Sequence, residues 1–212
     1  MKTNLLIIYI GILLGITSCS SNAPKLQNGD LLFVLDNSSA MGGAIEAATG
    51  EAGERNFTHV AILMVDQGKE HVLEATSKHG VRVTPLTDFL NESAKIDGRY
   101  GVVAMRLKDS TGVTQSIKRA LQHLGKDYDY SYHVDNDKFY CSELVWESYR
   151  RENGDRIFHD KPMNFRAKDG TMPEFWIELF DRLGEEIPEG QPGTNPNDMS
   201  KEECLEEVYR WF

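Results

Sequence analysis

The chain has 212 residues, of which 23 are basic and 33 acidic, so its formal net charge at neutral pH is −10. This length suits one domain of ordinary size with a hydrophobic core. The acidic balance argues against nucleic acid as a partner, because phosphate binding needs a basic surface. Three cysteines without a CxxC pair or a close cluster of cysteine and histidine argue against a structural zinc site.

The first residues have the pattern of an export signal. A short basic start precedes an apolar run over residues 5–16, which is too short to be a permanent membrane span. We therefore predict a signal peptide over residues 1–18.

A lipid attachment site follows this apolar run. Residues 16–19 read ITSC and resemble the lipobox of bacterial lipoproteins, in which the cysteine is acylated and becomes the first mature residue. An ordinary signal peptide with an incidental cysteine is the alternative. The resemblance implies lipid attachment at Cys19 and an exported bacterial lipoprotein of the cell envelope, periplasmic or outer-membrane-associated, with residues 19–28 as a polar tether.

The folded domain is predicted over residues 29–184 and mixes strands with helices. The pattern of apolar residues predicts strands over residues 31–35, 58–65, 70–76, 81–84 and 101–107, and helices over residues 42–49, 87–93, 110–124, 139–150 and 174–183. A tight turn between Asp66 and Lys69 makes two of these strands a hairpin. The helix over residues 139–150 has the pattern most typical of burial.

The end of the chain, residues 185–212, is predicted to be a Pro/Gly-rich tail with a short terminal helix. Residues 185–198 are rich in Pro, Gly and Asn and should be extended. Ser200 and Glu203 fit a helix capping box, and an apolar stripe at helical spacing follows at Cys204, Leu205, Val208 and Trp211.

Cys141 is a candidate nucleophile because it stands at the start of the predicted buried helix. A reactive cysteine must be a thiolate, which a helix N-terminus and a neighbouring imidazole both stabilise. The alternative is structural. If Cys19 carries lipid, Cys141 and Cys204 are the remaining thiols, and an exported protein could join them in a disulfide.

His59 is a candidate base, because the start of a buried strand is a costly place for an idle polar side chain. A structural core histidine is the alternative.

With a two-residue hairpin turn, His59 lies opposite Thr76 and Ala61 opposite Glu74, so Glu74 shares a face with His59. Glu74 could then accept a hydrogen bond from the imidazole and fix its tautomer. A solvated charge at a strand end is the alternative for Glu74.

Six segments occur in the order seen in the YiiX-like, circularly permuted papain-fold proteins of the NlpC-type superfamily. They read NGDLL (28–32), FTHVAI (57–62), VLEA (72–75), GV (80–81), GKDYD (125–129) and YCSELV (140–145). The sequence is similar to this family of cysteine peptidases and amidases over residues 28–150. The resemblance implies an α+β, permuted papain-like fold with an antiparallel sheet and the catalytic helix packed against it. It also implies a triad of His59, Glu74 and Cys141.

The chemistry implied by this resemblance is acyl transfer to a thiol, followed by hydrolysis. The backbone N–H of Cys141 is the natural first donor to the oxyanion. Tyr128 and Tyr140 are candidates for a second donor or a substrate contact, and aromatic packing is their alternative role. No cofactor and no metal is implied.

Three functions remain open. The first is hydrolysis of amide bonds at the cell envelope, in cell-wall peptides or N-acyl amino acids. The second is lipid acyl hydrolysis or transfer, suggested by the membrane tether and by a resemblance to lecithin retinol acyltransferase-like proteins. The third is non-catalytic ligand binding by an envelope lipoprotein. A long apolar groove at Cys141 would favour lipid, whereas a short cleft with charged ends would favour a small peptide or amino-acid amide.

Overall fold

A computed structural model describes residues 26–35, 39–134 and 136–212. The predicted signal peptide, Cys19 and most of the tether lie outside these residues. Within the described ranges, no helix combines the length and the apolar character that crossing a membrane requires.

One antiparallel sheet of six strands forms the centre of the molecule, with the order β10-β7-β1-β2-β3-β4. This sheet confirms the predicted α+β class and the predicted antiparallel arrangement. Five of its strands lie within one or two residues of their predicted positions. The strands are β1 (Leu31–Leu35), β2 (Phe57–Asp66), β3 (Lys69–Thr76), β4 (Gly80–Pro85), β7 (Val102–Leu107) and β10 (Leu205–Arg210).

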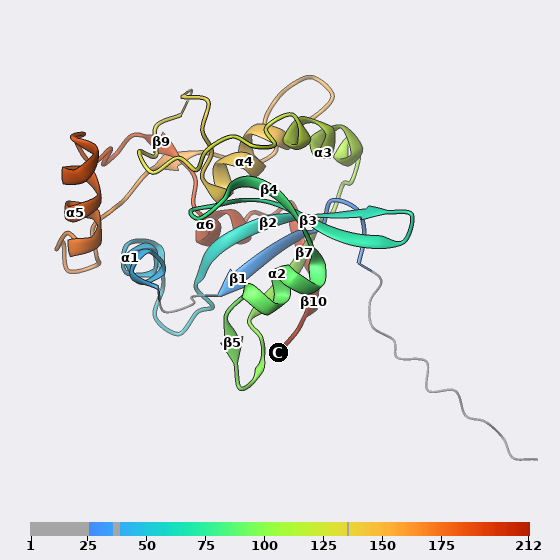
Figure 1. Ribbon diagram of the computed structural model, residues 1–212, viewed down its shortest axis with the longest axis horizontal. Coiled ribbons are helices and arrows are strands. Elements are labelled where there is room, and N and C mark those ends of the chain that lie inside the picture. The colour runs from blue at the N-terminus through green and yellow to red at the C-terminus, as the bar shows by residue number, and fades with distance from the viewer. Residues whose placement is uncertain (1–25, 36–38, 135) are drawn as a thin grey trace, which may run out of the picture.

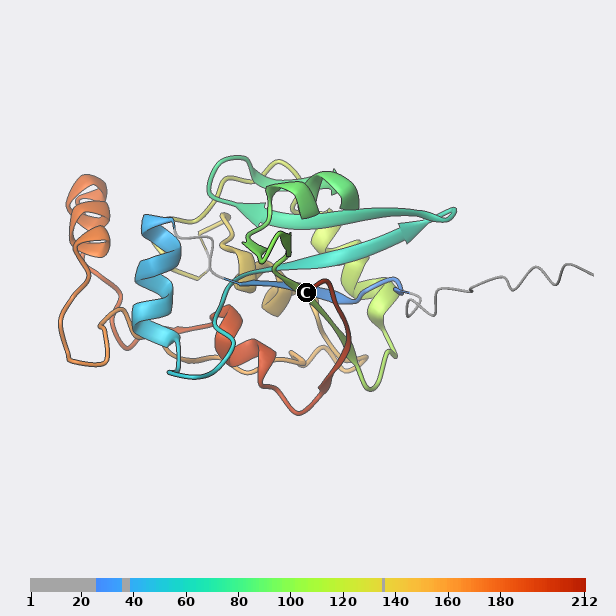
Figure 2. The same ribbon diagram turned by 90° about the horizontal axis from the view of Figure 1, so that it is seen from below.

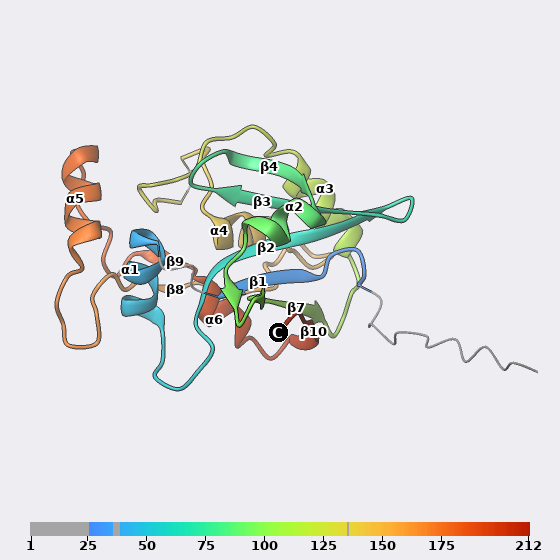
Figure 3. The ribbon, with the colours of Figure 1, turned by 60° about the horizontal axis from the view of Figure 1, so that its bottom comes forward.

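Helices and short hairpins surround this sheet. Helices α1 and α5 lie side by side at one end of it, and the tip of the β2–β3 hairpin projects from the opposite end (Figures 1, 2 and 3). The helices are α1 (Ala40–Thr49), α2 (Leu86–Glu92), α3 (Val113–Leu121), α4 (Cys141–Ser148), α5 (Glu174–Leu183) and α6 (Pro196–Ser200). Two small two-stranded sheets pair β5 (Lys95–Ile96) with β6 (Arg99–Tyr100), and β8 (Lys161–Pro162) with β9 (Pro192–Gly193).

Strand β1 is buried on both faces, which explains why its five residues are all apolar. Leu31 and Phe33 face the larger core, which α3 and α4 complete, whereas Leu32 and Val34 face a smaller core under α2. The two faces alternate because successive side chains of a strand point in opposite directions. Helix α4 packs against β2 and β3, as predicted for the helix that begins with the candidate nucleophile.

Helix α3 is shorter at both ends than the predicted range 110–124. It begins after Gly112, whose φ of +82° is left-handed, three residues after the predicted start. It ends at Leu121, three residues before the predicted end. Helix α5, by contrast, has the predicted bounds and ends at a left-handed Gly184, the usual helix stop.

The predicted terminal helix is wrong, because residues 205–210 form the edge strand β10. This strand pairs with β7 from Leu205↔Leu107 to Arg210↔Val103. A shift in register between Glu207 and Tyr209 breaks the strict alternation of side chains along this strand. The apolar residues of the strand therefore have a spacing that looked helical in the sequence. The open edge of β7 offers a full ladder of backbone hydrogen bonds, and this tertiary contact outweighs the local helical pattern. Helix α6 lies just before it, capped by Asn195.

Candidate active site

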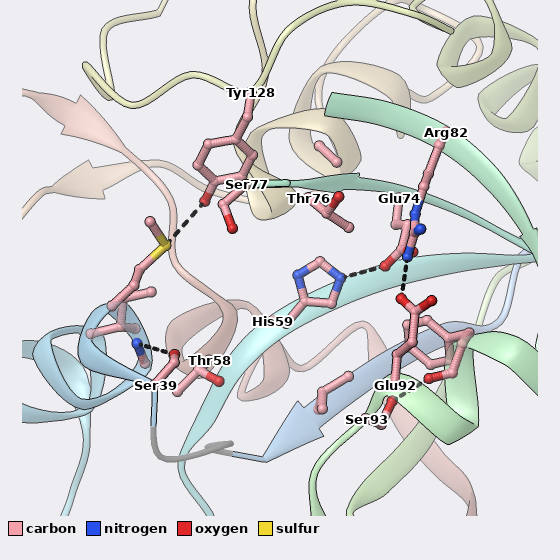
Figure 4. Close-up of a pocket in the computed structure, with 16 residues that line it drawn as sticks. Ser39, Thr58, His59, Glu74, Thr76, Ser77, Arg82, Glu92, Ser93 and Tyr128 are labelled. Carbon is pink, nitrogen blue, oxygen red and sulfur yellow. Dashed lines mark hydrogen bonds and ion pairs between the residues drawn. The ribbon is translucent and has the colours of Figure 1, made fainter. Parts of the chain in front are cut away.

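The register of the β2–β3 hairpin brings His59 and Glu74 together. Asp66 pairs with Lys69 across a two-residue turn, as predicted, and the ladder continues to Ile62↔Leu73. The Glu74 Oε2 atom lies 2.8 Å from Nε2 of His59 (Figure 4). The predicted placement of this pair is therefore confirmed.

An irregularity in the neighbouring ladder lies directly beside His59. Val34 pairs with His59, but the next residue of β1, Leu35, pairs with Phe57, so that Thr58 is left over on β2. Such a bulge bends its strand and redirects local side chains, and bulges are frequent beside active sites. Here the bulge places both Thr58 and His59 on the wall of one cleft.

Cys141 is the first residue of α4, and its side chain is almost fully buried. Cys141 and Cys204 are both free thiols, so the disulfide considered as an alternative is not formed. The Glu143 carboxylate accepts a hydrogen bond of 3.2 Å from the backbone N–H of Tyr140 and so closes the first turn of the helix. The thiol therefore lies at the positive end of the helix dipole, where a thiolate is stabilised.

The side chain of His59 interacts with both Cys141 and Glu74. Burial by itself would lower the pKa of His59, because it disfavours the charged imidazolium. Hydrogen bonds and charge attraction with Cys141 and Glu74 outweigh burial and raise the pKa of His59 to about 10. The imidazole is therefore protonated at neutral pH.

Replacing His59 by glutamine is expected to change how the free energy of unfolding depends on pH. Because the pKa of His59 is raised in the folded state, its contribution to stability is complete below the ordinary value of 6.5 and is lost as the pH rises to about 10. Glu74, whose pKa is lowered, stays ionised throughout this window. Urea unfolding from pH 6.5 to pH 10 should show wild type losing roughly 2–4 kcal/mol relative to the variant.

The control for this experiment is His79→Gln, since His79 is exposed in the turn between β3 and β4. That variant should follow the wild-type curve. If wild type and His59→Gln gave parallel stability curves, the protonated imidazole in the folded state would be refuted.

Arg82 and Glu92 extend the polar chain behind Glu74, and the sequence interpretation missed both. Arg82 stands directly opposite Glu74 on β4, and its Nε donates to Glu74 Oε1 at 3.0 Å. Its Nη2 donates to Glu92 Oε2 of α2 at 2.6 Å. Extending the hairpin register across the turn at residues 77–79 could have found Arg82, but nothing local pointed to Glu92.

Glu74 is buried, which by itself would raise the pKa of its carboxyl group. Its hydrogen bonds and charge attraction with His59 and Arg82 outweigh burial and lower the pKa instead. The carboxylate is therefore ionised, with one oxygen held by Arg82 and the other facing His59. The solvated strand-end charge considered for this residue is wrong, since only 3% of its side chain is exposed.

A polar cleft of 290 Å³ opens beside His59 (Figure 4). The Glu74–Arg82–Glu92 chain forms one end of it, and Tyr128 lies at the other, with its hydroxyl 3.9 Å from the sulfur of Met41. Several hydroxyl side chains share the lining, namely Ser39, Thr58, Thr76, Ser77 and Ser93. The structure therefore places Tyr128 on the wall of the polar cleft, and its role as a substrate contact stays a prediction.

A second, small cavity of 50 Å³ lies beside Cys141, which lines this cavity and not the polar cleft. Tyr128 and Ile45 line both this small cavity and the polar cleft. Tyr140 also lines the small cavity, but its hydroxyl accepts a hydrogen bond of 3.2 Å from the backbone N–H of Thr194. Tyr140 is thus part of the packed wall rather than of the polar cleft.

A close backbone contact fixes the segment that carries Tyr128. Gly80 has a φ of +65°, and a Cβ atom there would lie 2.2 Å from the carbonyl oxygen of Lys126. The next residue, Val81, exchanges backbone hydrogen bonds of 2.9 Å with Lys126 and Gly125. Two of the family segments, GV and GKDYD, therefore meet in space, and their glycines allow the contact.

The described residues also bear on metal binding. Nowhere among them do three or more His, Cys, Asp or Glu side chains come together in a group that could hold a metal ion. Glu74, the carboxylate nearest His59, is already held by Arg82.

Comparison with known proteins agrees with this geometry. Residues 25–209 match the family described as permuted papain-like amidase enzyme, YaeF/YiiX, C92 family. The chain is 30% identical to the YiiX protein of Escherichia coli K12 over 199 residues, which cover 92% of this chain and 90% of that protein.

The fold is also similar to the crystal structure of YiiX from Escherichia coli O157:H7, which is described as a metalloprotein. The TM-score is 0.69 at 26% identity, and the match covers 87% of this chain and 98% of that chain. The chain thus belongs to the YaeF/YiiX family of permuted papain-like amidases and is a cysteine hydrolase of the peptidase and amidase type.

Proposed function

We propose that this chain hydrolyses amide bonds with Cys141 as nucleophile, His59 as acid and base, and Glu74 as the residue that orients His59. The observation that carries the proposal is the position of His59, which interacts with Cys141 on one side and with the buried Glu74 carboxylate on the other. This is the arrangement that thiol acyl transfer requires.

In the first step the Cys141 thiolate attacks the amide carbonyl carbon, and the carbonyl oxygen becomes an oxyanion. As the C–N bond breaks, the His59 imidazolium gives its proton to the leaving amine. The acyl group then remains on Cys141 as a thioester. Water, losing a proton to His59, attacks this thioester and releases the carboxylic acid and the thiolate. Glu74 stabilises the imidazolium whenever His59 carries the proton.

The oxyanion needs hydrogen-bond donors. The first proposed donor is the backbone N–H of Cys141, which lies at the start of α4. We assign the second donor to Tyr128, because its side chain lines both the polar cleft beside His59 and the small cavity beside Cys141, and its hydroxyl lies against the weak acceptor sulfur of Met41. The Tyr140 hydroxyl is held by Thr194 and is better explained by packing.

The shape of the site favours peptide-like substrates over lipids. The polar cleft has charged groups at one end, whereas the apolar space beside Cys141 measures only 50 Å³ against 290 Å³ for the cleft. A long acyl chain does not fit so small a space. We therefore propose cell-wall peptides or N-acyl amino acids as substrates, which also suits the predicted export and lipid attachment at the cell envelope.

The proposal is tested by incubating the protein, with Cys141 kept reduced, with muropeptides and with a panel of N-acyl amino acids. Mass spectrometry should detect a new carboxylic acid and a new amine in equal amounts. If neither substrate class were cleaved and iodoacetamide failed to label Cys141 at neutral pH, a ligand-binding protein without catalysis would replace the proposal.

Replacing Glu74 by glutamine is expected to lower kcat about 10²-fold or more. Glutamine keeps the size of the side chain but cannot stabilise the imidazolium by charge. Initial rates on the best substrate measure the effect. Glu92→Gln is the matched control, since Glu92 also bonds Arg82 but does not touch His59, and its kcat should change only a few-fold. Equal kcat values for Glu74→Gln and wild type would remove Glu74 from the mechanism.

A further inference from the structure

We propose that the small cavity beside Cys141 binds the acyl group of the substrate, that it accepts only a small apolar group, and that Met163 sets its depth. This inference rests on the proposed function, because it divides the substrate at the bond that Cys141 attacks. It assigns each cavity to one half of the substrate and limits the size of the acyl half, which favours N-acyl amino acids with a short acyl chain over cell-wall peptides.

The position of His59 decides which half of the substrate lies where. The leaving amine must take its proton from His59, so it must lie within hydrogen-bond reach of the imidazole. His59 lines the polar cleft and not the small cavity, whereas Cys141 lines the small cavity. The amine half therefore occupies the polar cleft, and the acyl half, bound to the sulfur, extends into the small cavity.

The walls of the small cavity are aromatic and closely packed. Tyr132 contacts the rings of Tyr140, Phe165 and Trp176 at centroid distances of 5.1, 5.7 and 5.4 Å. Phe165 and Trp176 also pack edge to face at 5.1 Å. All four rings are buried. Because interlocked rings of this kind cannot move apart independently, the cavity cannot expand to take a larger group.

Several polar groups around the small cavity have partners within the protein, whereas the Tyr132 hydroxyl and the Trp176 indole N–H are buried without a hydrogen-bond partner among the described residues. The Thr194 hydroxyl donates to Ser142 at 3.0 Å, and the Asn164 amide donates to the backbone oxygen of Ala48 at 2.7 Å. Lys161 forms an ion pair with Asp198 at 3.1 Å. Because most of the remaining wall consists of aromatic and other apolar side chains, an apolar occupant is favoured.

Met163 is the flexible part of this wall. It directly follows β8 and pairs with the segment just before β9. A Cβ atom on Gly193 would be 2.5 Å from its sulfur. The absence of a side chain at Gly193 thus lets Met163 pack closely into the wall. Methionine has three rotatable bonds and no branching, so shortening it should deepen the cavity without disturbing the aromatic rings.

The experiment uses p-nitrophenyl esters of acetate, propionate, butyrate and hexanoate. In each reaction the Cys141 thiolate forms a C–S bond to the acyl carbon as the C–O bond breaks, and nitrophenolate leaves with the electron pair. Nitrophenolate needs no proton from His59, so the acylation rate reports the fit of the acyl group by itself. Each rate is divided by the rate of the same ester with glutathione, and intact mass confirms acylation of Cys141.

Wild type should be acylated by acetate and propionate esters about tenfold or more faster than by the hexanoate ester. Met163→Ala should bring the hexanoate rate close to the propionate rate. Ala48→Leu, which fills the cavity from α1, should slow propionate more than acetate. Met172→Ala removes a methionine outside both cavities and should keep the wild-type order of rates.

Equal normalised rates for all four esters in wild type would overturn the inference. So would an unchanged order of rates in both Met163→Ala and Ala48→Leu, and if one of these variants fails to fold the other decides. If no ester acylates Cys141 in wild type, the proposed nucleophile itself is wrong, which is a different result from acylation without size preference.

Discussion

Replacing Cys141 by alanine should abolish amide hydrolysis, with kcat falling by roughly 10⁴-fold or more, because the chain loses the atom that carries the acyl group. The variant should fold normally. The thiol is small and buried at the first residue of α4, and alanine is tolerated there without a large cavity. Initial rates on the best substrate, with the melting temperature measured alongside, test both statements.

Cys204→Ala is the matched control for this experiment. Cys204 is half-buried and lies beside Leu107 and Ile157 in a separate surface pocket. Burial raises the pKa of the Cys204 thiol, so it should be a poor nucleophile at neutral pH. Full activity in Cys204→Ala and none in Cys141→Ala is expected. Activity that survived in Cys141→Ala would overturn the proposed mechanism outright.

Replacing His59 by alanine is the second change with a very large expected effect. Hydrolysis should fall about as far as in Cys141→Ala, because residues that act as one catalytic unit are not additive. Alkylation of Cys141 by iodoacetamide at pH 7 should fall about tenfold or more. Without the imidazolium, the thiolate becomes a minor species of a few per cent, as for an ordinary thiol.

The pH dependence of alkylation makes this test specific. In His59→Ala the alkylation rate should rise steeply between pH 7 and pH 9, as expected for an ordinary thiol. In wild type the imidazolium persists to about pH 10, so the rate at pH 7 should be higher than in the variant and should rise less steeply with pH. His79→Ala should match wild type. Identical curves for wild type and His59→Ala would show that His59 does not activate Cys141.

Much of the central sheet and the pairing of His59 with Glu74 could be predicted from the sequence. The two-residue turn at residues 67–68 sets the register of the β2–β3 hairpin, and this register places Glu74 beside His59. The unbroken apolar run over residues 31–35 predicted the strand β1. These features depend on short-range order along the chain, where side-chain periodicity and turn length determine which residues meet.

Other features could not be predicted from local patterns in the sequence. The terminal segment looked helical, yet it pairs with β7, which lies about 100 residues earlier in the chain. The tail also supports the site. Asn197 Oδ1 accepts a 2.6 Å hydrogen bond from the backbone N–H of Phe57, two residues before His59, while its side-chain amide donates to Thr49 of α1.

Local sequence patterns were therefore enough to predict five of the six strands of the central sheet, the hairpin that pairs His59 with Glu74, and the position of Cys141 at a helix start. Only the tertiary structure decided that Glu92 lies within reach of Arg82, and that Met163 and Trp176 share a cavity with Cys141. The physical reason is that periodicity and turns act between near neighbours. Cavities form where segments distant in the chain pack together, and their size depends on side-chain volumes from every wall.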